Sequence, residues 1–286
     1  MSARSSRTLV GRLRLLLTEP LVAGRDPDSP EFTTAHREIL QRKAILRRVF
    51  ERFYEQCRSA DERHFGSQPG PRLEIGSGSS FMKRVLPQVW TSDLKVLPFL
   101  DLVSRAERLP FPAGSLRAIY AINVFHHLPD PEAFFRELVR VLRPGGGCVL
   151  IEPYHGPVAR VFFRHVHASE GFDMRAASWL GSALSGPMSN ANQALSYIVF
   201  TRDRGRFAAL HPGLEVVEQR PHTQAAYLLS GGVNFRQLAP DFCTPAVLGL
   251  DTALSALNRL LALQHTIVLR KRPGVSERAA EAAQRS

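Results

Sequence analysis

The chain has 286 residues, of which 44% are hydrophobic, so it can bury a large core in one main domain. Its formal charge of +11 suits contact with an anionic membrane surface, a phosphorylated substrate or nucleic acid, although no dense run of Lys and Arg indicates a nucleic-acid arm. Its three cysteines are far apart and have no histidine at ligand spacing, so the sequence predicts no disulfide framework and no metal site. It therefore indicates a reducing, cytoplasmic compartment.

The first part of the chain has helical patterns. Apolar residues recur at helical spacing within residues 8–22 and arginines surround them, which predicts a short basic amphipathic helix. Such a helix either packs on its own domain or lies on an anionic membrane. A linker over residues 26–30 and a long amphipathic helix over residues 34–57 follow. We expect residues 1–65 to form a helical extension, for which peripheral contact with the inner membrane face is one role.

From residue 72 onward, strand and helix patterns alternate. Buried strands are predicted at residues 73–75, 89–91, 118–124 and 148–151, an amphipathic helix at 131–142, and two later strands at 214–217 and 266–269. Strands that alternate with helices form parallel β-α-β units with helices on both faces. We therefore predict a doubly wound, Rossmann-like α/β domain over residues 66–272. It has a lid insertion at about residues 156–195 and a disordered tail over residues 273–286.

The first predicted strand runs into a turn of small residues that contains Gly76 and Gly78. Glycines let a backbone approach a ligand closely. Asp93 ends the next strand, where a carboxylate can accept hydrogen bonds from both hydroxyls of a ribose. Phe81 occupies the place of the third glycine of a dinucleotide-binding turn, which disfavours a pyrophosphate. The pattern predicts a nucleoside ligand, and Glu74 offers an acceptor for a cationic amino group.

Five motifs occur in an order that resembles class I S-adenosylmethionine-dependent methyltransferases, and most strongly the type 11 small-molecule group. They are Glu74-x-Gly76-x-Gly78, Asp93, Ala106-Glu107-x-Leu109-Pro110-Phe111, Asn123-x-x-His126-His127-Leu128-Pro129 and Arg143-Pro144-Gly145-Gly146. The likeness covers about residues 70–155. It implies a seven-stranded sheet with a reversed last strand, and S-adenosylmethionine as the cofactor.

The resemblance also implies which residues hold that cofactor. The methionine portion would lie against the glycine turn, the ribose against Asp93, and the adenine edge against Ala106 and Glu107. The full set carried over is Glu74, Gly76, Gly78, Asp93, Ala106, Glu107 and Asn123. One departure is Arg105, which stands where this group commonly has an aspartate that accepts from the adenine amino group.

Methyl transfer from a sulfonium is an in-line displacement, so proximity and orientation can supply most of the catalysis without a metal. A general base helps when the acceptor is a hydroxyl. Candidate bases follow the carboxyl ends of predicted strands, where open α/β sheets bind ligands. We predict His155 first, with His127 and Tyr154 as further catalytic candidates.

The predicted activity is methyl transfer to a small-molecule, glycan or lipid-linked acceptor. The basic charge keeps an RNA methyltransferase as an alternative, although no RNA-binding module is recognisable in the sequence. Arg105 supports a second alternative, a non-catalytic or repurposed binding protein with the same fold.

Overall fold

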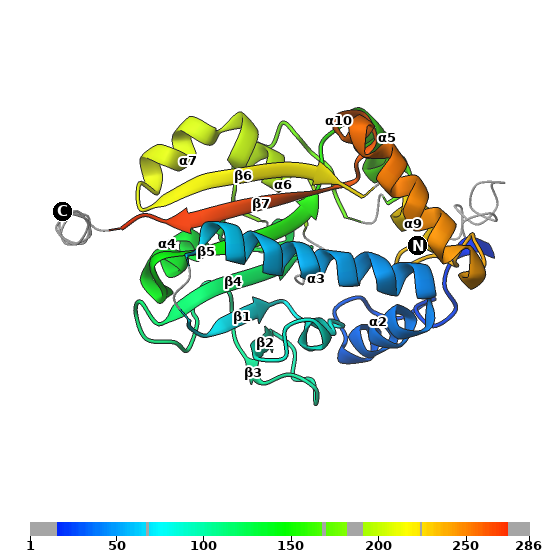
Figure 1. Ribbon diagram of the computed structural model, residues 1–286, viewed down its shortest axis with the longest axis horizontal. Coiled ribbons are helices and arrows are strands. Elements are labelled where there is room, and N and C mark those ends of the chain that lie inside the picture. The colour runs from blue at the N-terminus through cyan, green and yellow to red at the C-terminus, as the bar shows by residue number, and fades with distance from the viewer. Residues whose placement is uncertain (1–15, 67–68, 168–169, 182–190, 224, 274–286) are drawn as a thin grey trace.

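The computed structural model describes residues 16–66, 69–167, 170–181, 191–223 and 225–273, and the description below concerns these residues (Figure 1). A mixed seven-stranded sheet crosses the molecule in the order β3-β2-β1-β4-β5-β7-β6. The strands are β1 (Arg72–Ile75), β2 (Val89–Asp93), β3 (Leu102–Val103), β4 (Leu116–Ile122), β5 (Leu142–Pro153), β6 (Leu214–His222) and β7 (Gln264–Lys271).

The first five strands pair in parallel, whereas β7 is antiparallel to both β5 and β6. This confirms the expected doubly wound sheet with its last strand reversed. The six predicted strands are all present: five have longer bounds, β4 lies two residues earlier than predicted, and β3 is an addition. Its two residues are too few to give a period in the sequence.

Helices cover both faces of this sheet. They are α2 (Pro30–Arg42), α3 (Ala44–His64), α4 (Pro131–Val141), α5 (Pro157–His165), α6 (Leu195–Tyr197), α7 (Arg204–Leu210), α8 (Ala225–Ser230), α9 (Thr244–Ala253) and α10 (Asn258–Leu261). Single turns of other helix types occur at η2 (Met82–Arg84), η3 (Phe125–His127), η4 (Ile198–Arg202), η5 (Asp241–Cys243) and η6 (Leu254–Leu257). Among the described residues, no helix combines the length and the apolar character needed to cross a membrane.

Helix α3 lies across one face of the sheet, as Figure 1 shows. Its buried side includes Val49 and Phe53, which share a core with Val149 of β5 and Val268 of β7. The predicted N-terminal extension therefore supplies one of the two layers of the domain core. Burial of large apolar side chains contributes about 1.5–3 kcal/mol each, so the sheet face depends on this helix.

The predicted single helix over residues 34–57 is two helices that meet at Lys43. Lys43 has an extended backbone, and its buried ammonium donates to the carbonyl oxygens of Gly232 and Phe235. The same group lies 3.2 Å from a carboxylate oxygen of Glu19. Because a buried charge needs such partners, the chain leaves the helical path here to bring the lysine inward. The sequence pattern did not reveal this, since a lysine in an amphipathic helix usually faces solvent.

On the opposite face, α4 packs its apolar side against the sheet. Phe134 and Phe135 are fully buried and share a core with Phe200 and Phe207. The helix begins where the Asp130 side chain accepts a hydrogen bond from the Ala133 N–H at 2.8 Å, an N-cap of the usual kind. This confirms the helix predicted over residues 131–142.

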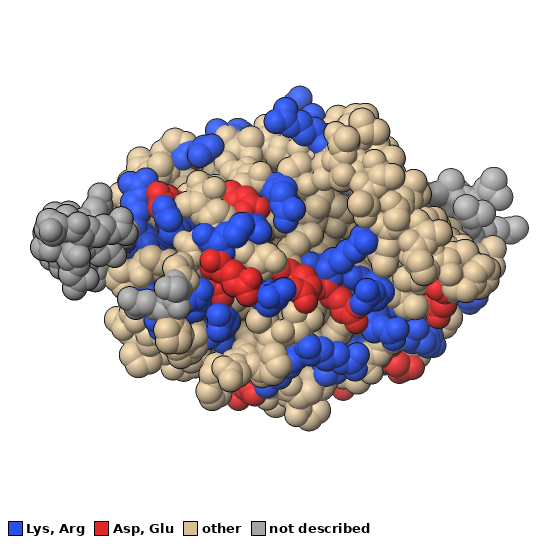
Figure 2. Space-filling model, viewed as in Figure 1, with Lys and Arg blue, Asp and Glu red and all other residues tan. Residues whose placement is uncertain are grey.

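The surface above α3 carries charges of both signs. Figure 2 shows Lys and Arg side chains interleaved with Asp and Glu along this helix. Arg58, for example, pairs with Glu55 at 2.7 Å and with Glu62 at 3.1 Å. Such exposed pairs contribute little to stability, but they balance much of the positive charge on this face locally.

The two ends of the chain are largely undescribed. Of the amphipathic helix predicted over residues 8–22, residues 8–15 lie outside the described residues, and residues 18–22 form a bridge and a turn, so the prediction was wrong for that part. The tail predicted over residues 273–286 lies outside the described residues except for Pro273. Leu16 and Leu17 are helical, and the backbone of Leu17 accepts a hydrogen bond from the Arg236 N–H at 2.6 Å. The first described residues of the chain are thus hydrogen-bonded to the loop after α8.

Candidate cofactor and acceptor site

The glycine turn after β1 needs the conformational freedom of its glycines. Gly76 and Gly78 have φ angles of 60° and 41°, in the left-handed region that other residues rarely adopt. A Cβ atom on Gly76 would lie 2.4 Å from a methyl carbon of Val124. The turn leads into η2, a single 3-10 turn.

Asp93, at the end of β2, holds this turn in place. One carboxylate oxygen accepts from the Gly78 N–H at 2.9 Å, and the other accepts from the Lys95 N–H at 3.0 Å. Lone pairs remain on both oxygens, because a carboxylate can accept about four hydrogen bonds. The sequence placed Asp93 beside the turn; the structure adds that it shapes the turn directly.

Glu74 lies at the end of β1 with only 2% of its surface exposed. Its Oε2 atom is buried and has no hydrogen-bond partner among the described residues. Burial raises the pKa of Glu74 to about 7, and the neighbouring Asp93 raises it further, whereas the hydroxyls of Ser80 and Ser77 oppose the rise. A buried acceptor without a partner is costly unless a ligand supplies a donor.

Ala106 and Glu107 follow β3 and line the same cavity. Glu107 has a buried Oε1 atom without a partner, while its Oε2 atom lies 3.6 Å from Nε of Arg105. The Arg105 side chain is 61% exposed and is absent from the described lining of the cavity. Arg105 therefore does not fill the predicted adenine pocket.

Asn123 directly follows β4 and has a φ of 54°, which asparagine tolerates better than most residues. Its backbone N–H donates to the Ile151 carbonyl at 2.8 Å, and its Oδ1 atom is buried without a partner among the described residues. Non-glycine residues in this conformation are often found at functional sites. Asn123 thus offers a third free acceptor to the cavity, after Glu74 and Glu107.

The turn after β4 is tied to the end of β5 by Glu152. One oxygen of this fully buried carboxylate accepts from the N–H groups of Val124 and Phe125, both at 2.9 Å. The other lies 2.6 Å from Nδ1 of His126. Sequence reasoning named Glu152 only as a residue that follows a strand. Its spacing from His126 in the chain gave no sign of this contact.

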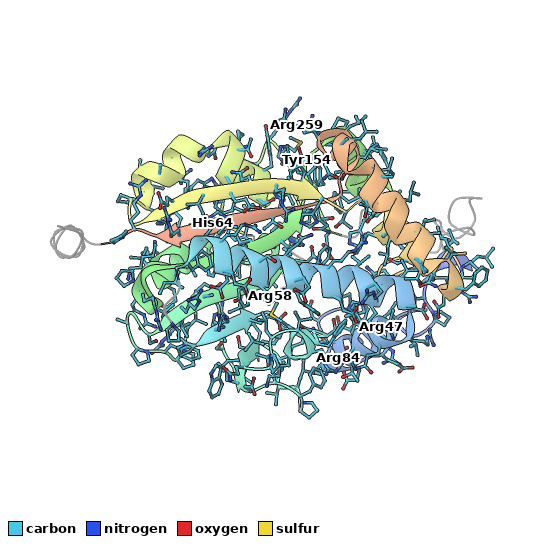
Figure 3. The ribbon with its side chains drawn as sticks, viewed as in Figure 1. Arg47, Arg58, His64, Arg84, Tyr154 and Arg259 are labelled. Carbon is cyan, nitrogen blue, oxygen red and sulfur yellow. The ribbon has the colours of Figure 1, made fainter. Side chains whose placement is uncertain are left out.

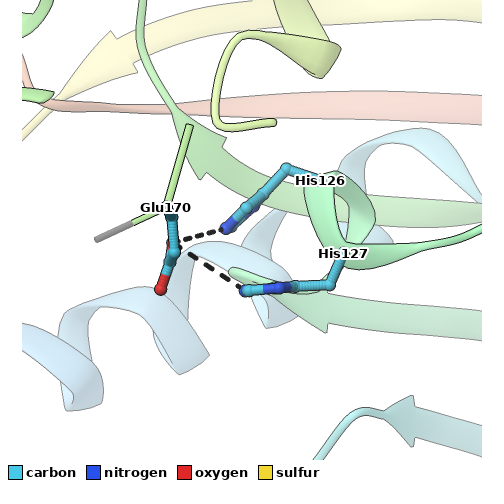
Figure 4. A group of neighbouring side chains, drawn as sticks. All are labelled: His126, His127 and Glu170. Atoms are coloured by element: carbon cyan, nitrogen blue, oxygen red, sulfur yellow. Dashed lines mark hydrogen bonds and ion pairs between the residues drawn. The ribbon is translucent and has the colours of Figure 1, made fainter. Parts of the chain in front are cut away.

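Beyond His126, side chains of the lid segment approach the same turn. Nε2 of His126 lies 3.3 Å from a Glu170 oxygen, and Nε2 of His127 lies 3.9 Å from it (Figure 4). Burial opposes a charge on His126, but Glu152 and Glu170 outweigh that effect and raise its pKa to about 10. Burial likewise disfavours ionised Glu170, yet hydrogen bonds from His126 and His167 hold its pKa well below its usual range.

Apart from Arg105 and Glu152, the side chains described above line one cavity of about 620 Å³ at the carboxyl ends of β1, β2, β4 and β5. Its wall from the N-terminal segment is formed by Val22, Phe32, Thr33 and His36, which sequence reasoning did not assign to the site. The predicted lid segment contributes Phe163, His167 and Glu170, and α8 and the loop after it contribute Tyr227 and Phe235. A second hollow, of about 550 Å³, lies between α3 and α9 near Arg47 and contains none of the predicted site residues (Figure 3).

The seven predicted cofactor residues all line this cavity, whereas the three predicted catalytic residues separate. His127 lines it, but Tyr154 and His155 are absent from its described lining. Tyr154 lies beside α10 (Figure 3) and packs with Phe163 and Leu263. His155 lies between the rings of Tyr154 and Tyr197, and burial lowers its pKa to about 4. Catalytic roles for these residues stay predictions.

Comparison with known proteins identifies the family. Residues 73–150 match the family described as a methyltransferase domain, known as type 11. Residues 73–150 carry the sequence of a class I S-adenosylmethionine-dependent methyltransferase domain of the type 11 group. The matched residues contain β1, the glycine turn, Asp93 and the turn with His126 and His127.

Individual relatives are more distant. The 27-O-demethylrifamycin SV methyltransferase of Amycolatopsis mediterranei (strain S699) is 42% identical over 45 residues, which span 16% of this methyltransferase chain and 16% of that protein. One solved structure is the complex of the Haloferax volcanii Trm112 methyltransferase activator with a methyltransferase. A chain of that complex is 14% identical to this chain, with a TM-score of 0.46. The match covers 84% of this chain and 98% of that one. Geranyl diphosphate C-methyltransferase of Streptomyces coelicolor A3(2), with Mg²⁺, geranyl diphosphate and S-adenosyl-L-homocysteine, has 16% identity and a TM-score of 0.43, covering 90% and 89%.

The cofactor of this methyltransferase domain is S-adenosylmethionine, and the residues of the cavity fit it. The cofactor has a cationic amino group, a ribose diol and an adenine with hydrogen-bond donors. The cavity offers the unpartnered carboxylate oxygens of Glu74 and Glu107 and the unpartnered amide oxygen of Asn123, together with Asp93. Glu74 would hold the amino group, Asp93 the ribose and Glu107 the adenine side.

Proposed function

We propose that this chain transfers the methyl group of S-adenosylmethionine to a small molecule, or to the reactive end of a glycan or lipid-linked acceptor. The observation that carries the proposal is the single cavity of about 620 Å³ that holds every predicted cofactor residue at one side and His127 with Glu170 at another. Cavities of this size are typical of sites for small ligands.

When bound, S-adenosylmethionine supplies an electrophilic methyl group on a sulfonium, which an acceptor atom attacks in line. The chain's own contribution is to orient the two molecules and to exclude water. The N-terminal wall at Val22 and Phe32 and the lid residue Phe163 are apolar and enclose the cavity from two sides. The acceptor would approach from the side of His127 and Glu170, and this keeps His127 as the predicted catalytic residue that meets it.

The residues of the predicted lid support a lipid-linked acceptor less strongly than the sequence suggested. Trp179, one of the apolar lid residues that suggested it, is only 2% exposed and donates to an Asp203 oxygen at 2.9 Å. Phe163 does line the cavity. Val161 is 62% exposed and remains a candidate for contact with an apolar acceptor chain.

Two experiments test the proposal in order. Calorimetric titration with S-adenosylmethionine and with S-adenosylhomocysteine comes first, and absence of binding by both would support the repurposed-protein alternative. Incubation with isotopically labelled S-adenosylmethionine and fractionated metabolite, lipid and RNA extracts follows, with mass detection of labelled products. A labelled product in the small-molecule or lipid fraction supports the proposal, whereas label confined to RNA overturns it.

A further inference from the structure

Three ligand-type side chains from two separate segments converge on the acceptor side of the cavity. His126 and His127 come from the turn after β4, and Glu170 comes from the lid segment after α5 (Figure 4). One ligand atom from each lies within 4.8 Å of the other two. In a tetrahedral zinc site with bonds of about 2.1 Å, neighbouring ligand atoms lie about 3.4 Å apart. The observed separations from Glu170 are 3.3 Å for His126 and 3.9 Å for His127.

His126 is oriented as a metal-ligating histidine is. Its Nδ1 atom is held by Glu152 at 2.6 Å, so an ion that displaces the Nε2 proton would meet an Nε2 lone pair directed toward Glu170 and the cavity. Metal-bound histidines almost always donate their other ring nitrogen to such a carboxylate. Glu152 is itself fixed by the backbone N–H groups of Val124 and Phe125, so the ring has little freedom to turn.

Glu170 is held in position from its backbone. The side-chain amide of Gln193, 1% exposed, donates to the carbonyl oxygens of Glu170 at 2.7 Å and of His167 at 3.1 Å. The backbone N–H of the neighbouring Asn192 donates to the His126 carbonyl at 3.1 Å. The two segments that carry the three side chains are therefore joined by hydrogen bonds, and this limits the reorganisation that ion binding would require.

We propose that His126, His127 and Glu170 bind a divalent transition-metal ion, with Zn²⁺ as its representative, in the wall of the cofactor cavity. Two imidazoles and one carboxylate form a donor set that suits zinc or iron, whereas magnesium and calcium prefer oxygen ligands alone. Glu152 and Glu170 place one carboxylate group at each ring nitrogen of His126, so acidic groups surround the position of the ion. His167, whose Nε2 lies 3.7 Å from Glu170, is the nearest described candidate for a further ligand.

One consequence rests on the proposed function. An oxygen atom of the acceptor that bound to this ion would lose its proton more readily, because a bound metal lowers the pKa of an oxygen ligand. The ion would then take the place of a general base. The binding of the ion itself requires neither cofactor nor acceptor, so it can be measured independently of methyl transfer.

The experiment uses the full chain after treatment with a chelator. Zn²⁺ is titrated calorimetrically into the wild type and into the variants Glu170→Gln, His127→Ala and His165→Ala. His165 is an exposed histidine at the end of α5, in the segment that leads to Glu170, and serves as the matched control. We expect one ion per wild-type chain, at least about a hundredfold weaker binding in the first two variants, and unchanged binding in the control. Circular dichroism verifies that each variant is folded.

A second measurement needs no variant. X-ray absorption at the zinc edge of the wild-type protein should show nitrogen and oxygen ligands at about 2.0–2.2 Å. Sulfur ligands at about 2.3 Å would assign the ion to cysteines and overturn the proposal. The proposal is also overturned by absence of stoichiometric binding, or by binding that Glu170→Gln and His127→Ala leave unchanged. A failure to detect methyl transfer leaves these readouts intact and counts only against the proposed function.

Discussion

The carboxylate of Glu152 lies 2.6 Å from Nδ1 of His126 and joins the end of β5 to the turn after β4. Both side chains are almost fully buried. The same carboxylate accepts hydrogen bonds from two backbone N–H groups of that turn. A single side chain thus sets the conformation of the turn that carries His126 and His127 to the wall of the cavity.

We predict that Glu152→Ala lowers the free energy of unfolding by about 3–5 kcal/mol. The substitution leaves His126 and the N–H groups of Val124 and Phe125 buried without their acceptor, and removal of one partner from a buried pair is costly. Urea denaturation followed by circular dichroism measures this loss. The control Glu55→Ala removes an exposed carboxylate of α3 and should change stability by less than about 1 kcal/mol. Similar losses in the two variants would contradict the importance of this contact.

Asp93→Ala should weaken S-adenosylmethionine binding by roughly 10- to 100-fold, since hydrogen bonds to a charged group contribute about 1.5–3 kcal/mol. Asp101→Ala is the matched control. Asp101 also accepts a backbone N–H, that of Thr91 at 2.8 Å, but it is absent from the described lining of the cavity. Calorimetric dissociation constants compare the two. Equal affinity in the wild type and Asp93→Ala would remove Asp93 from the cofactor site.

Cofactor affinity should rise with pH because of Glu74. Burial raises its pKa to about 7, so at pH 6 about one tenth of the unliganded protein has this carboxylate ionised. If the ionised form binds the cationic amino group, the apparent affinity at pH 6 should be about tenfold lower than at pH 8. Titrations with S-adenosylmethionine across this range measure the slope, and Glu74→Gln should flatten it.

The same residue predicts a trend in stability without ligand. Because the folded-state pKa of Glu74 is raised from 4.5 to about 7, the folded protein binds more protons than the unfolded chain between these values. The contribution of Glu74 to the free energy of unfolding is therefore fully present below this window and falls as pH rises through it. Subtracting the stability curve of Glu74→Gln from that of the wild type isolates the trend, and an opposite slope would contradict the assignment.

Gly76→Ala should destabilise the fold and weaken cofactor binding together. An alanine there would have to adopt the left-handed backbone conformation, which costs about 1–2 kcal/mol. Its Cβ atom would also lie only 2.4 Å from a methyl carbon of Val124. Gly114→Ala is the control, since Gly114 has a φ of 64° but no atom within 4 Å of an added Cβ. Thermal unfolding should show the larger loss for Gly76→Ala, and only this variant should lose affinity for S-adenosylmethionine.

The sequence by itself determined those features that depend on residues close together in the chain. Alternating strand and helix patterns, the glycines before Phe81 and the aspartate at a strand end predicted the sheet and its cofactor side, because each depends on neighbouring residues in the chain. The break at Lys43 was missed since its cause, the carbonyl groups near Gly232, is distant in sequence.

Only the tertiary structure decided the acceptor side of the cavity. Tyr154 and His155 follow a strand, as a catalytic residue often does, yet they are absent from the described lining of the cavity. His126, Glu152 and Glu170 come from three separate segments, and no spacing in the chain shows that they meet. Their contacts depend on the order of strands in the sheet and on the path of the lid. The predicted cofactor residues could be found from local patterns in the sequence. The fold brings them into one cavity with a cluster of ligand-type side chains that no local pattern indicated.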